Sequence, residues 1–541
     1  MTTLRVPVLI VGAGLAGLTA AVLLGWRGIP ALLVERRAST SRHPRARGVN
    51  LRSMELLRGV PGLEKSLRTA SPLDMDEFSI VIAESVRGRV FKTLLAPGTL
   101  DSSLLSPSER CSAGQDVVEP ILLRHAQSFG ADIRFGTELA SFTQDKNGVE
   151  AVLRDRATGE RSLITANYLI AADGNRSPVR QALGIGVEGR GTLSHNISIL
   201  FEAADLAAVL KRQGFALYYL QNKDFTGVFV STDDPRIGQV SVEYDPQKEG
   251  AESYGAARCA DIVRAALGTP DLALTILNVM PWEMSAQVAR QMMESRVFLA
   301  GDAAHTMPPT GGLGGQTAIQ DAADLAWKLA LVLHGRAGAE LLTTYESERH
   351  PIAVMTVEKQ TANYVERLRI DRTDLTNPAA EIDYMSVAMG YRYRSAGIIA
   401  DATDNGQLTE DPMRPTGRPG TRLPHVEVMR DGQAISTLDL AGNGFLLLAG
   451  QTGDAWGKAA RLVSTQMGVE IIFCQLGNKI IDKADTVMAQ TGLAPSGALL
   501  IRPDGFIAWR AVGIMGDPAG ELNDVMNRIL FRETEARAGI A

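Results

Sequence analysis

The chain has few of the features that mark secreted, metal-binding or nucleic-acid-binding proteins. Its 541 residues include only three cysteines, Cys111, Cys259 and Cys474, which are far apart in the sequence. This spacing excludes a disulfide framework and a cysteine-ligated metal cluster. The formal net charge of −6 gives no basic surface of the kind that binds nucleic acid.

Signals for export, membrane insertion and internal repetition are also lacking. The first expected strand is preceded by no basic segment or cleavage site, so we expect a cytoplasmic protein. Glycines interrupt the apolar run Val6–Leu24, which favours a strand, a turn and a short helix over a membrane span. No solenoid-type repeat recurs, and a length of 541 residues suggests several domains.

The most informative stretch is a glycine-rich turn between an expected strand and an expected helix. The apolar strand Val8–Val11 is followed by Gly12, Gly14 and Gly17 in the spacing G-x-G-x-x-G. The first glycine allows a tight turn, the second lets the backbone approach a pyrophosphate, and the third lets the helix pack on the strand. Glu35 ends the next apolar strand, where a carboxylate can accept hydrogen bonds from ribose hydroxyls. Together these features predict a dinucleotide site.

Two further apolar strands end in motifs that pair glycine with aspartate. Tyr168–Ala172 continues into Asp173 and a glycine, and Val297–Ala300 continues into a glycine and Asp302. The glycine-rich segment 308–316 then leads to an expected helix. In their order and spacing, the three motifs resemble those of the FAD-dependent aromatic hydroxylases. The pattern of the whole chain is most similar to the aromatic polyketide hydroxylases of the anthracycline type.

The resemblance implies an α/β fold whose parts are interleaved along the chain. We expect a Rossmann-like FAD-binding domain, an antiparallel β-sheet domain for the substrate and a C-terminal thioredoxin-like α/β domain. Short alternating runs between Ile197 and Pro281 are typical of antiparallel strands. The expected segments are 1–75, 105–185 and 285–370 for the FAD-binding domain, 76–104 and 186–284 for the substrate sheet, 371–422 for a helical and loop connection, and 423–541 for the thioredoxin-like domain.

The C-terminal block is expected to contain strands at 436–440, 444–449, 469–474 and 498–501. It contains no C-x-x-C sequence and only one cysteine, Cys474. We therefore expect a structural or dimer-related role for this block rather than thiol redox chemistry.

The resemblance also implies which residues bind the cofactor. Glu35 and Arg36 would hold the ADP half of FAD, Arg45 would lie near the flavin and pyrophosphate, and Gln115 and Asp302 would contact the ribityl chain. The full set is Gly12, Gly14, Gly17, Glu35, Arg36, Arg45, Gln115, Asp173, Asp302, Gly312, Leu313 and Gly314.

The glycine-rich segment has a chemical reason to lie beside a flavin. Reduced flavin carries negative charge near its N1–C2=O edge, and the N–H groups of 312–315 with the helix dipole would stabilise that charge. One residue departs from the family pattern, because Gln316 stands where the family usually has asparagine. A side-chain contact from this position to the flavin is therefore in doubt.

Three residues are candidates for the reacting region. Pro309 should border the reacting edge of the flavin, and Arg367 matches an arginine that lies near the substrate in similar hydroxylases. Tyr218 and Tyr219 are adjacent on an expected strand, so only one of them faces the pocket, and we expect Tyr218. His305 follows the strand-end aspartate and is a weaker candidate, either as a general base or as a local hydrogen-bonding group.

The predicted protein is an FAD-dependent monooxygenase that consumes NAD(P)H, with NADPH favoured, and hydroxylates an aromatic, polycyclic polyketide with O2. The resemblance implies a flavin C4a-hydroperoxide as the oxygen donor. No metal, nucleic-acid or membrane partner is expected, and the protein would be a monomer or homodimer. The alternatives are Baeyer–Villiger oxidation of a polyketide ketone and a non-hydroxylating protein that binds flavin and polyketide.

Overall fold

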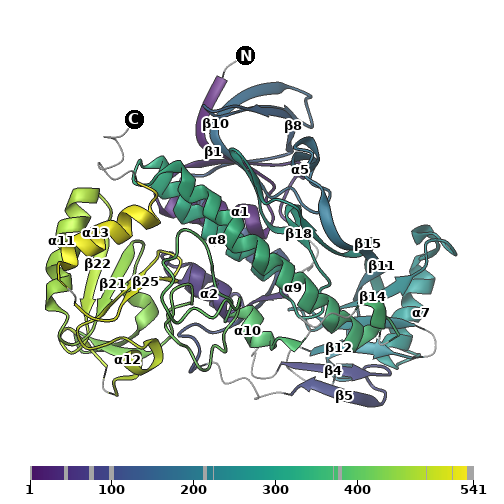
Figure 1. Cartoon of the computed structure of the whole chain (residues 1–541). Helices are drawn as coiled ribbons and strands as arrows, with labels where there is room; N and C mark the ends of the chain where they lie inside the picture. The colour runs from purple at the N-terminus through teal and green to yellow at the C-terminus, as the bar shows by residue number, and fades with distance from the viewer. Residues whose placement is uncertain are drawn as a thin grey trace.

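The protein is described here from a computed structural model. The structure describes residues 3–41, 47–71, 78–96, 103–210, 216–222, 225–369, 371–375, 381–482, 484–514 and 516–532. Figure 1 shows the C-terminal elements on the left and a large sheet at the lower right, with the helices α8 (Gly314–Leu333) and α9 (Thr344–Leu368) between them.

The N-terminal sheet is parallel at its centre. β1 (Thr3–Val11) lies between β10 (Arg161–Ala171) and β2 (Ala31–Glu35), and β17 (Val297–Leu299) lies beyond β10. Because these strands run in the same direction, the turns that follow them meet at one edge of the sheet. This edge therefore collects all three motifs that the sequence singled out.

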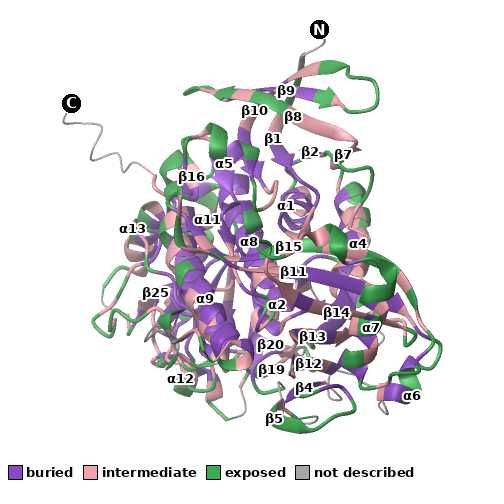
Figure 2. Cartoon of the chain, turned by 90° about the vertical axis from the view of Figure 1, so that its right-hand side faces the viewer, coloured by how far each residue is buried: buried purple, intermediate pink, exposed green. Residues whose placement is uncertain are grey.

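Two long helices cover this sheet near its glycine turns. α1 (Leu15–Trp26) packs against α8 and against α4 (Gln115–Ser128). The apolar residues Val8–Ile10 of β1 have no exposed surface and share a core with α1 and α8. Figure 2 shows buried residues concentrated along α1 and α8, whereas the hairpin of β8 (Thr137–Gln144) and β9 (Val149–Asp155) carries exposed residues.

The second sheet has eight strands in the order β18-β15-β11-β14-β13-β12-β4-β5. The strands are β4 (Ser79–Ala83), β5 (Val90–Leu95), β11 (Val187–Glu202), β12 (Ala216–Gln221), β13 (Thr226–Ser231), β14 (Ile237–Tyr244), β15 (Thr275–Ala289) and β18 (His305–Thr306). Neighbours are antiparallel except β4 and β12. The antiparallel strands expected between Ile197 and Pro281 are confirmed.

The C-terminal block forms a four-stranded sheet with helices packed on it. The strands, in spatial order, are β22 (Ile471–Gln475), β21 (Phe445–Ala449), β24 (Ala498–Ile501) and β25 (Ile507–Ala511). α11 (Asp454–Met467) packs on β22 and on α13 (Pro518–Ile529). Cys474 lies buried on β22 as a free thiol, and its burial raises the pKa of that thiol.

One expected strand of this block is wrong. Ser436 ends the short strand β20 (Gln433–Ser436), and Thr437–Leu440 is a 3-10 turn. The Ser436 hydroxyl accepts from the backbone N–H of Leu438, and Asp439 accepts from the backbone N–H of Ser436. This capping box satisfies the backbone locally, so a helical turn forms despite the apolar residues.

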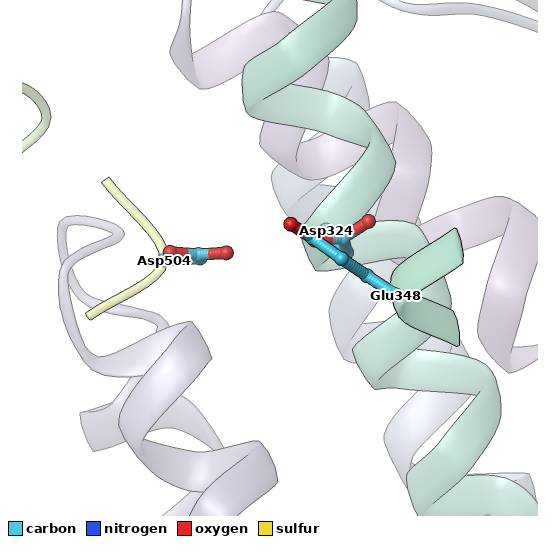
Figure 3. A group of neighbouring side chains, drawn as sticks. All are labelled: Asp324, Glu348 and Asp504. Carbon is cyan, nitrogen blue, oxygen red and sulfur yellow. The ribbon is translucent and has the colours of Figure 1, made fainter. Parts of the chain in front are cut away.

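A buried ionic cluster joins the C-terminal block to α8 and α9. In Figure 3 the carboxylates of Asp324 from α8, Glu348 from α9 and Asp504 from the C-terminal block point toward one another. Lys328 Nζ lies 2.7 Å from both Asp324 Oδ2 and Glu348 Oε2. Arg502 binds Glu348 through two hydrogen bonds of 2.6 and 2.9 Å and also contacts Asp504. The two cations thus neutralise a group that by spacing alone resembles a metal site.

Burial and neighbouring charges set the protonation of the cluster. Burial, with Glu348 and Asp504 nearby, raises the pKa of Asp324 well above its usual value. Although burial opposes it, Arg502 and Lys328 hold the pKa of Glu348 well below its usual value. The two cations, Lys328 and Arg502, thus offset the negative charge of the buried carboxylates. Among the described residues, no helix is both long and apolar enough to cross a membrane.

Candidate active site

The first glycine turn leaves no room for side chains at two of its three glycines. Gly12 has φ +106°, and a Cβ there would lie 2.2 Å from the carbonyl oxygen of Ala172. A Cβ on Gly17 would lie 1.9 Å from the carbonyl oxygen of Gly12. Gly12 therefore packs the turn against the end of β10, and Gly17 packs α1 against the turn.

Gly14, the second glycine of the motif, borders open space at the start of α1. Gly14 precedes Leu15 as the N-cap, with no side chain bonded to the helix N-terminus. A Cβ on Gly14 would meet a single neighbour, Glu119 Oε1, at 3.9 Å. The N-terminus of α1 thus offers backbone N–H groups and the positive end of a helix dipole, which is the arrangement that binds a pyrophosphate.

The acidic residue at the end of β2 lies beside this turn. Glu35 Oε2 accepts from the backbone N–H of Ala13 at 2.9 Å, and Oε1 accepts from the backbone N–H of Arg37 at 2.9 Å. The side chain of Arg36 is exposed, and its carbonyl accepts from Arg156. Arg45 lies outside the described residues.

Two further predicted cofactor residues contact the first turns of helices. Gln115 is the first residue of α4, and its Nε2 donates to Glu119 Oε1 at 2.6 Å. Asp173 Oδ2 accepts from the backbone N–H of Val179 at the start of α5 (Pro178–Ala182).

The motif after β17 is held from beneath by a buried network. Asp302 is exposed at the carboxyl edge of the sheet, in the 3-10 turn Gly301–Ala303. Asp321 of α8 accepts from the backbone N–H of Gly301 at 3.0 Å, lies 2.7 Å from His305 Nε2 and accepts from Arg349 Nε at 2.8 Å. Although burial opposes it, His305 and Arg349 lower the pKa of Asp321. His305 is thus buried and hydrogen-bonded to Asp321, as expected for a local hydrogen-bonding group.

The glycine-rich loop of residues 309–313 is hydrogen-bonded to α9. The carbonyl of Pro309 accepts from the backbone N–H groups of Gly311 and Gly312 at 2.8 and 3.0 Å. Thr310 Oγ1 donates to the carbonyl of Gln360 at 2.8 Å. Leu313 is buried and caps α8, whose first turn begins at the following glycine.

The residue that departs from the family pattern has a structural task. Gln316 Nε2 donates to the carbonyl of Gly48, and its Oε1 accepts from the backbone N–H of Asn50. Both ends of the amide are therefore engaged with the segment before α2 (Leu51–Arg58). The longer side chain of glutamine reaches this backbone and ties the start of α8 to it.

Tyr218, the tyrosine expected at the pocket, and Tyr219 lie on opposite faces of the second sheet. Tyr218 packs against Phe229, with ring centroids 6.1 Å apart, in a core beneath α7 (Ala256–Leu267). Tyr219 points to the opposite face, where it packs with Val357 of α9 and Trp282. Adjacent strand residues alternate in direction, and sequence alone does not say which face carries the site.

Tyr219 and Arg367 form a pair on that face. Arg367 Nη1 lies 3.1 Å from Tyr219 Oη, and the guanidinium carbon is 5.5 Å from the centre of the tyrosine ring. Burial raises the pKa of Tyr219, while Arg367 opposes that rise. Arg367 follows Gln360 by two helical turns, so the pair lies about 10 Å along α9 from the loop 309–313.

Sequence reasoning missed several residues that support the site. Asp321, Arg349 and Tyr384 were not singled out, although Asp321, Asp324 and Lys328 repeat at spacings of three and four on an otherwise apolar helix. Charged residues at helical spacing in an apolar helix indicate a buried polar face, so this face of α8 could have been predicted from the sequence.

The residues at this edge of the sheet suit an FAD molecule. The turn at Gly12 is closed to side chains, the helix start at Gly14 is open, and Asp302 stands exposed at the end of β17. These are features of a phosphate cradle followed by a hydroxyl acceptor. The fold and the site therefore define a flavoprotein of the Rossmann type.

Comparison with known proteins identifies the family. Residues 5–360 match the FAD binding domain family, and residues 416–532 match the family of the aromatic-ring hydroxylase C-terminal domain. The chain belongs to the FAD-dependent aromatic-ring hydroxylases.

Individual relatives cover the chain almost completely. It is 41% identical to aklavinone 12-hydroxylase of Streptomyces purpurascens, over 98% of this chain and 99% of the relative. It is 38% identical to 4-methyl-5-nitrocatechol 5-monooxygenase of a Burkholderia species, over 98% of each chain. The crystal structure of aklavinone-11 hydroxylase with FAD and aklavinone superposes with a TM-score of 0.94 at 40% identity, covering 98% of this chain and 100% of the other.

Proposed function

We propose that the protein is an FAD-dependent, NAD(P)H-consuming monooxygenase that hydroxylates an aromatic, polycyclic polyketide. The observation that carries this proposal is the Tyr219–Arg367 pair on the α9 face of the second sheet. The loop 309–313 contacts the same helix at Gln360, two turns away. Gln360 and Arg367 are about 10 Å apart along the axis of α9, a length comparable with that of several fused rings.

The cofactor would be held at the edge of the N-terminal sheet. When bound and reduced by NAD(P)H, with NADPH favoured, FAD supplies the oxygen-activating chemistry. The N–H groups at the start of α8 would face the negatively charged edge of the reduced ring. The proposed binding residues are Gly12, Gly14, Gly17, Glu35, Arg36, Arg45, Gln115, Asp173, Asp302, Gly312, Leu313 and Gly314.

On the substrate side, the pair would orient and activate a phenol. The hydroxyl of Tyr219 would hydrogen-bond a phenolic oxygen, and the charge of Arg367 would stabilise the phenolate that develops there. Ionisation raises the electron density of the neighbouring ring carbon, which is the atom that takes up oxygen. Trp282 and Val357 offer apolar contacts to the rings, and Pro309 would border the reacting edge.

The finer division of the chain is part of the same proposal. The FAD-binding, substrate-sheet, connecting and thioredoxin-like segments would follow the bounds expected from the sequence. The four-stranded C-terminal sheet with its packed helices supports a thioredoxin-like arrangement. Its buried Cys474 supports a structural rather than a redox role.

The test is substrate-stimulated oxidation of NADPH. A tetracyclic phenolic polyketide such as aklavinone should bind at micromolar concentration, accelerate NADPH oxidation and yield a product one oxygen atom heavier. NMR of that product distinguishes ring hydroxylation from Baeyer–Villiger insertion. 4-Hydroxybenzoate should give negligible stimulation, because a single ring buries less apolar area at about 25 cal/mol per Å². Equal turnover of the single-ring acid would overturn the polycyclic assignment, and flavin binding without turnover would favour a binding protein.

A further inference from the structure

A tyrosine from the connection between the two family-matched regions contacts the loop 309–313. Tyr384 begins the short helix α10 (Tyr384–Ala388), and its hydroxyl donates to the carbonyl of Gly311 at 2.9 Å. Asp383 fixes the start of α10 by accepting from the backbone N–H of Ser386 at 3.0 Å. The hydrogen bond from Tyr384 thus holds the peptide group between Gly311 and Gly312.

That peptide group has little intrinsic preference for its orientation. Gly311 has φ +147° and Gly312 has φ +69°, and glycine adopts such values without steric cost. Rotation of the peptide plane needs only opposed changes of ψ at Gly311 and φ at Gly312. Two hydrogen bonds select the observed orientation: the carbonyl of Gly311 accepts from Tyr384, and the N–H of Gly312 donates to Pro309.

Alternative partners for the rotated peptide lie close at hand. A Cβ on Gly311 would come within 2.6 Å of Gln360 Oε1, 2.7 Å of Gln360 Nε2 and 3.0 Å of Asn363 Nδ2. Both amide nitrogens are buried and have no hydrogen-bond partner among the described residues. Buried donors without partners are costly and call for an explanation. These side-chain amides, which include the unpartnered acceptor Gln360 Oε1, lie beside Gly311 and could partner the C=O or N–H of a rotated peptide.

The geometry points to Tyr384 as a positioning residue that fixes the Gly311–Gly312 peptide and thereby the N-terminus of α8. In the observed orientation the loop leads into Leu313 and the first N–H groups of α8. Rotation would redirect a peptide dipole next to those groups and change the field at the reduced flavin. This inference rests on the proposed function, because it needs the flavin to lie at this loop.

The test measures the reduction potential of the bound flavin. Tyr384→Phe removes only the donor and should shift the two-electron potential by about 30 mV, which corresponds to about a tenfold change in the affinity for reduced relative to oxidised FAD. Tyr254→Phe is the matched control: it removes a phenol bonded to Glu249, far along the chain and beneath α7, and should leave the potential unchanged.

A second variant reaches the same peptide without touching Tyr384. Gly312→Ala disfavours φ +69° and would relax on rotation, so it should shift the potential in the same direction as Tyr384→Phe. The double variant should shift it no further than the larger single effect, because both act on one peptide. Folded, FAD-loaded variants with an unchanged potential, or with strictly additive shifts, would overturn the inference. A wild-type protein that binds no FAD would instead overturn the proposed function.

Discussion

Replacing Arg502 by methionine should strongly destabilise the C-terminal core, because the change removes one partner of a buried ionic cluster. Arg502 makes two hydrogen bonds to Glu348 and further contacts to Asp504, and these side chains are almost completely buried. Breaking a buried pair in this way costs about 3–5 kcal/mol. The guanidinium also lies 5.0 Å from the ring centre of Trp327, so the loss should fall in the upper half of that range.

The destabilisation should depend on pH with a definite sign. Arg502 and Lys328 hold the pKa of Glu348 below its unfolded value. The stability that this carboxylate contributes is therefore present above its unfolded pKa, about 4.3, and is lost as the pH falls toward the folded pKa. Without Arg502, ionised Glu348 contributes less to the free energy of unfolding. The difference in the free energy of unfolding between wild type and Arg502→Met should be largest near neutral pH and should become smaller below about pH 4.3.

Urea unfolding followed by tryptophan fluorescence measures the effect, since Trp327, Trp456 and Trp509 lie in this core. Arg414→Met is the control, because the Arg414 side chain is 89% exposed and its ion pair with Asp411 is long, at 4.0 Å. This substitution should change the free energy of unfolding by less than about 0.5 kcal/mol. Adding Glu348→Gln to Arg502→Met should recover part of the loss by removing the unbalanced charge. A loss below about 1 kcal/mol at pH 7 for the single variant would refute the reasoning.

Three further outcomes are expected. Asp302→Ala should purify with much less FAD, since a charge-assisted bond to the ribityl chain is worth about 1.5–3 kcal/mol; full occupancy and unchanged affinity by absorbance titration would contradict the assignment. Cys474→Ser should keep turnover within about threefold, with a packing cost of about 1 kcal/mol, and a folded but inactive variant would reopen a redox role. Arg367→Met should lower kcat/KM about ten- to hundredfold through the loss of one charged hydrogen bond, with normal FAD content and partial rescue by Arg367→Lys; unchanged kcat/KM would remove Arg367 from the site.

The glycine motifs could be recognised from the sequence because their constraints are local. A Cβ on Gly17 would strike the carbonyl oxygen of Gly12, five residues earlier, and Gly12 has φ +106°, which favours glycine. The further clash of a Cβ on Gly12 with the carbonyl oxygen of Ala172 involves a distant segment and is visible only in the structure. The strands around them are short apolar runs, and their order along the chain already implies a parallel sheet with its turns at one edge. Predicted strands such as Ala498–Ile501 agree with the structure for the same reason.

The sequence analysis misread one local signal and left one choice to the tertiary structure. The segment 436–440 has the composition of a strand, but a capping box turns it into a helical turn. Tyr218 and Tyr219 are equivalent in a sequence pattern, and only the packing of α9 on one face of the sheet decides that Tyr219 meets Arg367.

The sequence by itself determined the class of fold, the place of the dinucleotide turn and the candidate residues at the ends of the strands. Periodicity, glycine sterics and motif spacing act over a few residues, so they can be read directly. The tertiary structure alone decided which charges pair in the buried cluster. It also decided that Gln316 accepts from the backbone N–H of Asn50 and that Tyr384 donates to the loop 309–313. These contacts join residues that are up to about 270 positions apart. Their geometry follows from how whole elements pack, and no local pattern encodes it.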